Sequence, residues 1–272
     1  MKKGYGFIEF ENIDEFKTWL KKQKVYRTIT RLQVHHMWLP DYSCWSKDNA
    51  LRRQKNTKDY HIQHNHWDDI AQHFSIMPNG HIVTGRSLNK TPIGIRGWNT
   101  NAICCEIYGN FDKGHDKMTK SQQEVVVAFY GELCKKFKLT PSTATIRPHA
   151  WFTAGGTYLG DYSPSRSAKS CPGTNFMGIG NTKKAFVKFY SMIKEYMNGK
   201  EEPKKEDTSK YTTGVYRVDT DDLNVREKAT ADSEKVGVVH KGDAYTITKV
   251  EGNWGYLKSG LGWINLKYCK KV

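Results

Sequence analysis

Residues 102–108 read AICCEIY and are followed at once by Gly109 and Asn110, two residues typical of turns. A short apolar run that is closed by turn residues predicts a strand buried inside a sheet. Its single charge is Glu106, and a lone carboxylate is costly to bury unless it is paired or used in chemistry. The run therefore predicts a central strand with Glu106 as a candidate catalytic residue. The alternative is an ordinary ion-paired strand carboxylate.

Further strand signals occur on the N-terminal side of this run. Residues 32–35 alternate in hydropathy like the end of a strand. Residues 73–77 and 81–84 flank the sequence Pro78-Asn79-Gly80. Because an Asn-Gly pair adopts the positive φ angles of a tight turn, these two segments predict a β-hairpin.

Three segments have apolar residues at helical spacing. Residues 13–23 follow a capping-box pattern, and residues 182–197 place five apolar side chains on one face. A third helix begins near residue 120, capped either by Thr119 or by Ser121, each with a Gln or Glu three positions further on. Strands that are interspersed with helices predict an α/β domain, with a mixed central sheet flanked by helices.

The chain changes character near residue 198. Residues 198–213 mix both charges with Gly and Pro and hold Tyr211 as their only large apolar residue, so they predict a linker. Residues 214–272 contain five short strand patterns separated by Gly-containing turns, which predict a small all-β barrel. We therefore expect a domain over 1–197 and a second domain over 214–272.

The net charge is strongly positive. Lys and Arg number 43 and Asp and Glu 28, which gives +15. Residues 1–198 hold 29 basic and 16 acidic side chains and carry +13 of this excess. Such a field favours polyanionic partners: nucleic acid, an anionic membrane or an acidic cell wall. The absence of an apolar run near 18 residues and the mean hydropathy of −0.72 argue against membrane insertion.

The cysteines and the N-terminal residues indicate the cellular compartment in which the protein is made. The six cysteines show no Cys-x-x-Cys pair and no framework spacing, so we expect reduced thiols in a protein made in a cytoplasm. Glu9 and Glu11 interrupt any apolar segment after the basic start, so no secretion signal is expected.

Three potential metal ligands lie far apart in the sequence: His35, His149 and Cys171. Imidazole and thiolate suit Zn²⁺, and three protein ligands leave a fourth position open, as in catalytic zinc sites. Taken singly, a histidine is more often a surface or hydrogen-bonded residue, and a cysteine more often a small buried apolar residue. Their spacing alone does not decide between these interpretations.

The segments around these residues resemble those of a known family. In the same order along the chain, they resemble the motifs of type 2 N-acetylmuramoyl-L-alanine amidases, a family that includes phage lysozymes with amidase activity and peptidoglycan recognition proteins. The resemblance covers about residues 25–195 and rests on five segments: Leu32–His36, Asp69–Arg86, Ala102–Asp112, Arg147–His149 and Lys169–Pro172.

The resemblance implies an activity and a set of roles. The family uses one zinc ion to cut the amide bond between the lactyl group of N-acetylmuramic acid and L-alanine. The implied zinc ligands are His35, His149 and Cys171, with His36 as an unligated neighbour. Glu106 resembles the strand carboxylate that acts as general base in some relatives, and Lys169 resembles the cation that stabilises the oxyanion.

Two further features of this domain are less specific. The resemblance also places Gln72 where other relatives use a Tyr as the catalytic group, so that role would fall to Glu106. Residues 57–68 hold three histidines, and we interpret them as a surface loop, which could border the active cleft. The letters His64-Asn65-His66 do not form the spaced pattern of an HNH nuclease.

Residues 214–272 resemble a bacterial SH3-like domain, a class that usually binds cell-wall peptide or peptidoglycan. Trp254, Tyr256 and Trp263 are candidates to stack on a ligand. In a barrel this small, at least one of these aromatic residues normally belongs to the core.

These observations together predict a zinc-dependent, wall-lytic amidase of a phage or prophage. The expected partners are peptidoglycan, of Gram-positive type, and anionic wall polymers. Without a secretion signal, the enzyme would be made in the host cytoplasm and would reach the wall after membrane permeabilisation. The alternatives are a non-catalytic peptidoglycan-binding protein of the same fold and a host autolysin. Specific nucleic-acid binding would explain the charge of +15 but not the ordered motifs.

Overall fold

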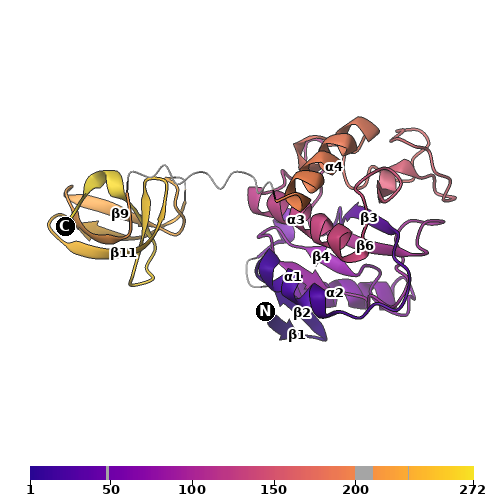
Figure 1. Ribbon diagram of the computed structural model, residues 1–272, viewed down its shortest axis with the longest axis horizontal. Helices are drawn as coiled ribbons and strands as arrows, with labels where there is room; N and C mark the ends of the chain where they lie inside the picture. Colours follow the sequence, from indigo (N-terminus) through magenta and orange to yellow (C-terminus); the bar gives the residue numbers. More distant parts are fainter. Residues whose placement is uncertain (47–48, 200–210, 232) are drawn as a thin grey trace. The chain divides into compact units, whose positions relative to one another are not determined.

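The computed structural model describes residues 1–46, 49–199, 211–231 and 233–272 (Figure 1). The chain divides into two compact units, Met1–Lys200 and Glu201–Val272. Most of the expected linker, at 200–210, lies outside the described residues, so the domain limits 1–197 and 214–272 stay predictions. Among the described helices, none combines the length and apolar character needed to cross a membrane.

The first unit contains a seven-stranded mixed sheet in which the strand with Glu106 is central. The strand order is β1-β2-β5-β4-β6-β3-β7. The bounds are β1 (Lys2–Gly4), β2 (Phe7–Phe10), β3 (Arg31–His36), β4 (Phe74–Ile76), β5 (Ile82–Thr84), β6 (Ala102–Ile107) and β7 (Ile146–Pro148). Strands β4, β6, β3 and β7 run parallel, and β4 and β5 form the predicted hairpin. The predicted mixed sheet is confirmed.

Four α-helices accompany this sheet: α1 (Ile13–Lys22), α2 (Ala50–Gln63), α3 (Lys120–Phe137) and α4 (Lys183–Met197). Asn12 caps α1, where its side-chain oxygen accepts a hydrogen bond from the backbone N–H of Glu15 at 3.0 Å. Thr119 rather than Ser121 caps α3, because its hydroxyl accepts from the backbone N–H of Gln122 at 3.1 Å.

The two faces of the sheet have different partners. Helices α1, α3 and α4 cover one face, which we call the core face, and pack on its apolar side chains, such as Val34, Ile103 and Cys105 (Figure 1). Since side chains alternate along a strand, Gln33, His35, Cys104 and Glu106 lie on the opposite side, which we call the cavity face. Helix α2 packs against β1, β2 and β5 beside a second, smaller apolar cluster.

The prediction of a loop at residues 57–68 is wrong over most of its length, because helix α2 extends to Gln63. The helix has a weak sequence signal, since Ala50 and Gln54 are its only buried residues. A largely polar helix lacks the apolar stripe from which amphipathic helices are recognised.

The second unit is an all-β antiparallel sheet, as predicted. The strand order is β10-β9-β13-β12-β11-β8-β14. The bounds are β8 (Gly214–Val218), β9 (Asp222–Arg226), β10 (Lys235–His240), β11 (Ala244–Glu251), β12 (Trp254–Leu257), β13 (Trp263–Asn265) and β14 (Cys269–Lys271). Strands β9 to β13 correspond to the five expected ones, and β8 and β14 add a pair between the two ends of the unit. Its core includes Tyr216, Val225, Ile247 and Ile264.

Candidate active site

Parallel strand pairing brings three of the predicted site residues to one edge of the sheet. In the register of β3 and β6, His35 lies opposite Glu106, and the His35 Nδ1 atom is 3.7 Å from Glu106 Oε1. His149 directly follows β7, whose last residue, Pro148, pairs with Val34. Because the carboxyl ends of parallel strands meet at one edge, residues 114 positions apart become neighbours, with the rings of His35 and His149 5.1 Å apart.

The loop that carries Cys171 is fastened to this edge by several contacts. Asp112 accepts hydrogen bonds from the Ser170 hydroxyl at 2.8 Å and from the Thr174 N–H at 2.9 Å. Gly173 has φ +115°, and a Cβ there would lie 2.3 Å from the carbonyl oxygen of Phe111. These contacts place Cys171 Sγ 3.6 Å from His35 Nδ1.

His35, His149 and Cys171 thus form one group, whose potential ligand atoms all lie within 4.8 Å of one another. His35 and Cys171 are buried, and His149 is partly exposed to the cavity. Two imidazoles and a thiol are the donors that zinc prefers, and three of them leave a position for water or substrate. The chemistry of this donor set therefore fits a zinc ion. His35 also belongs to a second group of potential ligands, which it forms with Cys104 and Glu106.

The second histidine of the doublet faces elsewhere. His36 is on the core side of β3, and its Nδ1 accepts a hydrogen bond from the backbone N–H of Phe111 at 3.1 Å. Burial lowers the pKa of His36 to about 4. Its backbone N–H lies 3.4 Å from Cys171 Sγ, so this residue contacts the group through its main chain rather than through its ring.

Burial shifts the pKa values of the ionisable side chains at this site. It raises the pKa of Glu106 to about 8, which the nearby Lys169 ammonium partly opposes. It lowers the pKa of His149 to about 4 and holds the pKa of His35 well below its usual value, and the Lys169 charge acts in the same direction on both. At neutral pH the imidazoles are therefore uncharged and able to act as ligands, while Glu106 can take up or release a proton.

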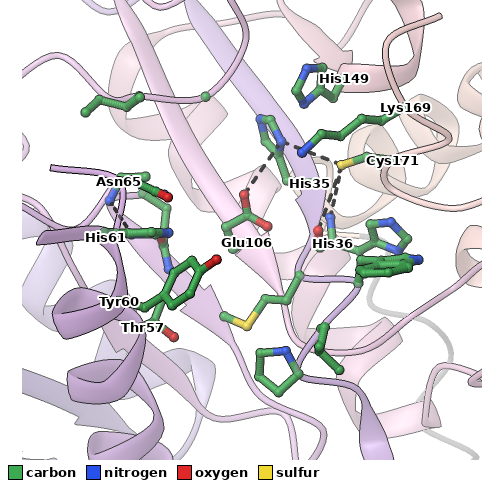
Figure 2. Close-up of a pocket in the computed structure, with 18 of the residues that line it drawn as sticks. His35, His36, Thr57, Tyr60, His61, Asn65, Glu106, His149, Lys169 and Cys171 are labelled. Atoms are coloured by element: carbon green, nitrogen blue, oxygen red, sulfur yellow. Dashed lines mark hydrogen bonds and ion pairs between the residues drawn. The ribbon is translucent and has the colours of Figure 1, made fainter. Parts of the chain in front are cut away.

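These residues line one end of a cavity of about 930 Å³ (Figure 2). Lys169 lies at the same end, and Thr57, Tyr60 and His61 of α2 form the opposite wall. The sequence indicated residues 57–68 as a loop that could border the active cleft, and so missed that a helix forms this wall. The signal that could have found it is the spacing of polar residues at 53, 57, 60 and 61, which fall on one helical face.

The structure also shows where four more of the predicted residues lie. Gln72 also lines the cavity but is fully buried, and its amide nitrogen donates to the Ser75 hydroxyl at 3.0 Å. In the second unit, Trp263 is only 8% exposed and its ring lies 5.1 Å from that of Tyr256, whereas Trp254 and Tyr256 are half-buried.

Comparisons with known proteins match both units. The family described as N-acetylmuramoyl-L-alanine amidase matches residues 25–174, which is more than half of the chain. The family described as bacterial SH3 domain matches residues 221–270.

Individual relatives are more distant. Peptidoglycan-recognition protein 2 of Holotrichia diomphalia is 33% identical over 89 residues, which are 33% of this chain and 46% of that protein. Peptidoglycan-recognition protein LB of Drosophila melanogaster is 26% identical over 78 residues, or 29% of this chain and 33% of that protein. The chain spans about half the length of the curated relatives that it matches.

The solved structures that match the chain include one from an insect and one from a bacterium. Drosophila PGRP-LB aligns with a TM-score of 0.45 and 17% identity, over 62% of this chain and 84% of that one. The N-acetylmuramoyl-L-alanine amidase LysC from Clostridium intestinale aligns with a TM-score of 0.42 and 20% identity, over 63% of this chain and 87% of that one.

Proposed function

The chain belongs to the N-acetylmuramoyl-L-alanine amidase family, and from this premise we propose that it is a zinc-dependent hydrolase of peptidoglycan. The bond cut would be the amide between the lactyl group of N-acetylmuramic acid and L-alanine. The observation that carries the proposal is the convergence of His35, His149 and Cys171 next to Glu106 at one end of a large cavity.

The proposed roles follow from the chemistry of each group. A zinc ion held by the two histidines and Cys171 would supply a Lewis acid for the scissile carbonyl and for a water molecule. Glu106 would accept a proton from the attacking water at a carboxylate oxygen. The same carboxyl would return the proton to the L-alanine nitrogen as the C–N bond breaks.

Lys169 would act on the charge that develops during this reaction. Its side chain lies at the same end of the cavity as His35 and Cys171, and its ammonium group already influences both the His149 and the Glu106 equilibria (Figure 2). As negative charge builds on the carbonyl oxygen, the ammonium group would stabilise it by a charge-assisted hydrogen bond.

Product analysis tests this function. Purified Gram-positive cell walls are digested with the protein, and the products are assayed for new L-alanine amino termini and for new reducing sugars. We expect amino termini without reducing ends, and we expect a chelator to abolish their release and added zinc to restore it. Reducing ends alone would indicate a glycosidase. Binding to walls without any new termini would support the non-catalytic alternative.

We further propose that the biological role is lysis of a Gram-positive bacterial host by a phage or prophage enzyme. The net charge of +15 supports attraction to anionic wall polymers, and the bacterial SH3 domain supports binding to peptidoglycan. Production in the host cytoplasm, with access to the wall after membrane permeabilisation, belongs to the same proposal. Its test is expression in a Gram-positive host, where lysis should occur only when the membrane is also permeabilised.

A further inference from the structure

A buried glutamine contacts the ring of His35 on the side away from the potential metal. Gln33 lies two residues earlier on β3, on the same cavity face, and is fully buried. Its side-chain oxygen Oε1 is 3.2 Å from His35 Nε2. The other ring nitrogen, Nδ1, is the atom that faces Cys171 Sγ at 3.6 Å and Glu106 Oε1 at 3.7 Å.

The neighbours of Gln33 fix which way its amide points. Its nitrogen Nε2 donates to the Trp98 carbonyl oxygen at 3.0 Å and to Asn99 Oδ1 at 3.0 Å, while the Ile95 N–H donates to Oε1 at 3.2 Å. The reversed amide would set oxygen against the Trp98 oxygen and N–H against the Ile95 N–H. Neither arrangement can form a hydrogen bond, so the oxygen faces His35.

The orientation of Gln33 determines the tautomer of His35. An amide oxygen only accepts, so the ring nitrogen that it contacts must carry the proton. A neutral imidazole, the form that can bind a metal, carries a proton on only one of its two ring nitrogens. The proton on Nε2 therefore leaves a free lone pair on Nδ1, the nitrogen that faces Cys171 and Glu106.

The loop formed by residues 94–99 is built around this amide. Gly94 donates its N–H to Asn99 Oδ1 at 2.9 Å, which leaves that oxygen placed to accept from Gln33 as well. A Cβ at Gly94 would lie 2.0 Å from Gln33 Oε1, although the φ angle of Gly94 is outside the left-handed region. Glycine is thus required here by the Gln33 side chain and not by the backbone conformation.

We propose that Gln33 is a positioning residue of the metal centre, which holds His35 in the Nε2–H tautomer and so presents Nδ1 to the metal. The 94–99 loop would be its support. The metal part of this inference rests on the proposed zinc function, whereas the tautomer part does not. Outer-shell acceptors of this kind typically raise metal affinity about 10- to 100-fold.

Zinc affinity is measured by chelator competition on full-length Gln33→Leu and Gly94→Ala proteins. The first variant removes the acceptor, and the second displaces it while leaving Gln33 in place. Matched controls are Gln122→Leu, another fully buried glutamine with two backbone acceptors, and Gly155→Ala, where a Cβ has room. We expect zinc binding weakened about 10- to 100-fold in the two test variants only. Wild-type affinity in either folded test variant would overturn the role in metal binding.

A ¹⁵N NMR spectrum of the His35 ring in the zinc-loaded wild-type protein tests the tautomer directly. We expect the proton on Nε2, and a mixture of tautomers or a changed Nε2–H signal in Gly94→Ala. A proton on Nδ1 in the wild-type protein overturns the inference, whether or not the variants fold. If the wild-type protein binds no zinc, the proposed zinc function fails, and the same spectrum of the protein as isolated still decides the tautomer.

Discussion

Cys171 is the one sulfur ligand of the proposed zinc site; its side chain is buried, and its loop is fastened by the hydrogen bonds from Ser170 and Thr174 to Asp112. A serine at this position keeps the size of the side chain but replaces a zinc-preferring thiolate by a weakly ligating hydroxyl. We expect Cys171→Ser to weaken zinc binding by more than the roughly 10- to 100-fold typical of an outer-shell loss. Metal analysis after dialysis measures this. Equal stoichiometric zinc in both proteins would exclude Cys171 as a ligand.

Glu106 and Lys169 are proposed to act on the reaction and not on the metal. Glu106→Gln removes the proton acceptor, and Lys169→Ala removes the cation, while the three ligands remain. We expect both variants to keep zinc but to lose about 10²- to 10³-fold in turnover, as for the loss of a well-placed oxyanion partner. Turnover of soluble muropeptides and zinc content are measured on the same samples. A variant with near-wild-type turnover would remove its residue from the mechanism.

The buried ring of His73 should make the stability of the folded state depend on pH. Both ring nitrogens are occupied: Nδ1 accepts from the Cys104 N–H at 3.0 Å, and Nε2 lies 2.9 Å from the Lys90 carbonyl oxygen. Burial, helped by the charges of Arg27 and Arg86, lowers the pKa of His73 to about 3.

In the unfolded chain a histidine titrates near pH 6.5, so below that pH the unfolded state binds a proton that the folded state does not. Stability conferred by neutral His73 is therefore present above pH 6.5 and falls as the pH drops towards 3. Between pH 6.5 and 5 this single group should cost about 2 kcal/mol. Urea unfolding at both pH values should show a smaller loss in His73→Gln than in the wild-type protein. An equal loss in both would contradict the assigned shift.

At the scale of elements, the loop that carries Cys171 depends on Gly173. An added Cβ would meet the Phe111 carbonyl oxygen at 2.3 Å, and backbone atoms cannot move aside cheaply. We expect Gly173→Ala to weaken zinc binding and to destabilise the fold by more than the about 1–2 kcal/mol that a positive φ alone costs. The control is Gly160→Ala, which has φ +82° with nothing within 4 Å. Equal thermal stability and equal zinc affinity in the two variants would show that the close contact is unimportant.

The elements differ in how far the sequence predicts them. Helix α3 has a Thr119 cap and a regular apolar stripe, and both are local signals. Helix α2 has neither an N-terminal side-chain cap nor an apolar stripe, so no local signal marks it. The grouping of His35, His149 and Cys171 was predictable from five ordered segments because these resemble a family; their role as zinc ligands stays a proposal. Gln33 was not, since its importance depends on contacts with residues more than 60 positions away.

The two units differ in their net charge. Residues 1–198 carry +13, whereas residues 213–272 hold 10 basic and 8 acidic side chains, or +2. We expect a fragment ending near Asn198 to fold, to cleave soluble muropeptides and to bind walls in a salt-sensitive way. The fragment 213–272 should bind walls with weak salt dependence, because aromatic stacking and hydrogen bonds are screened little by salt. Sedimentation with purified walls at low and high salt measures both. A C-terminal fragment that stays in solution throughout would leave its wall-binding role without support.

The division of β3 and β6 into a core face and a cavity face has an evolutionary consequence. Val34 and Cys105 pack under the helices, while their immediate neighbours His35 and Glu106 line the cavity and Gln33 contacts His35 from the same side of the sheet. Adjacent residues of β3 and β6 are therefore under different selection: one for packing in the core, the next for chemistry in the site. Substitutions at alternate positions of β3 and β6 can therefore change the lining of the cavity without changing the hydrophobic interior.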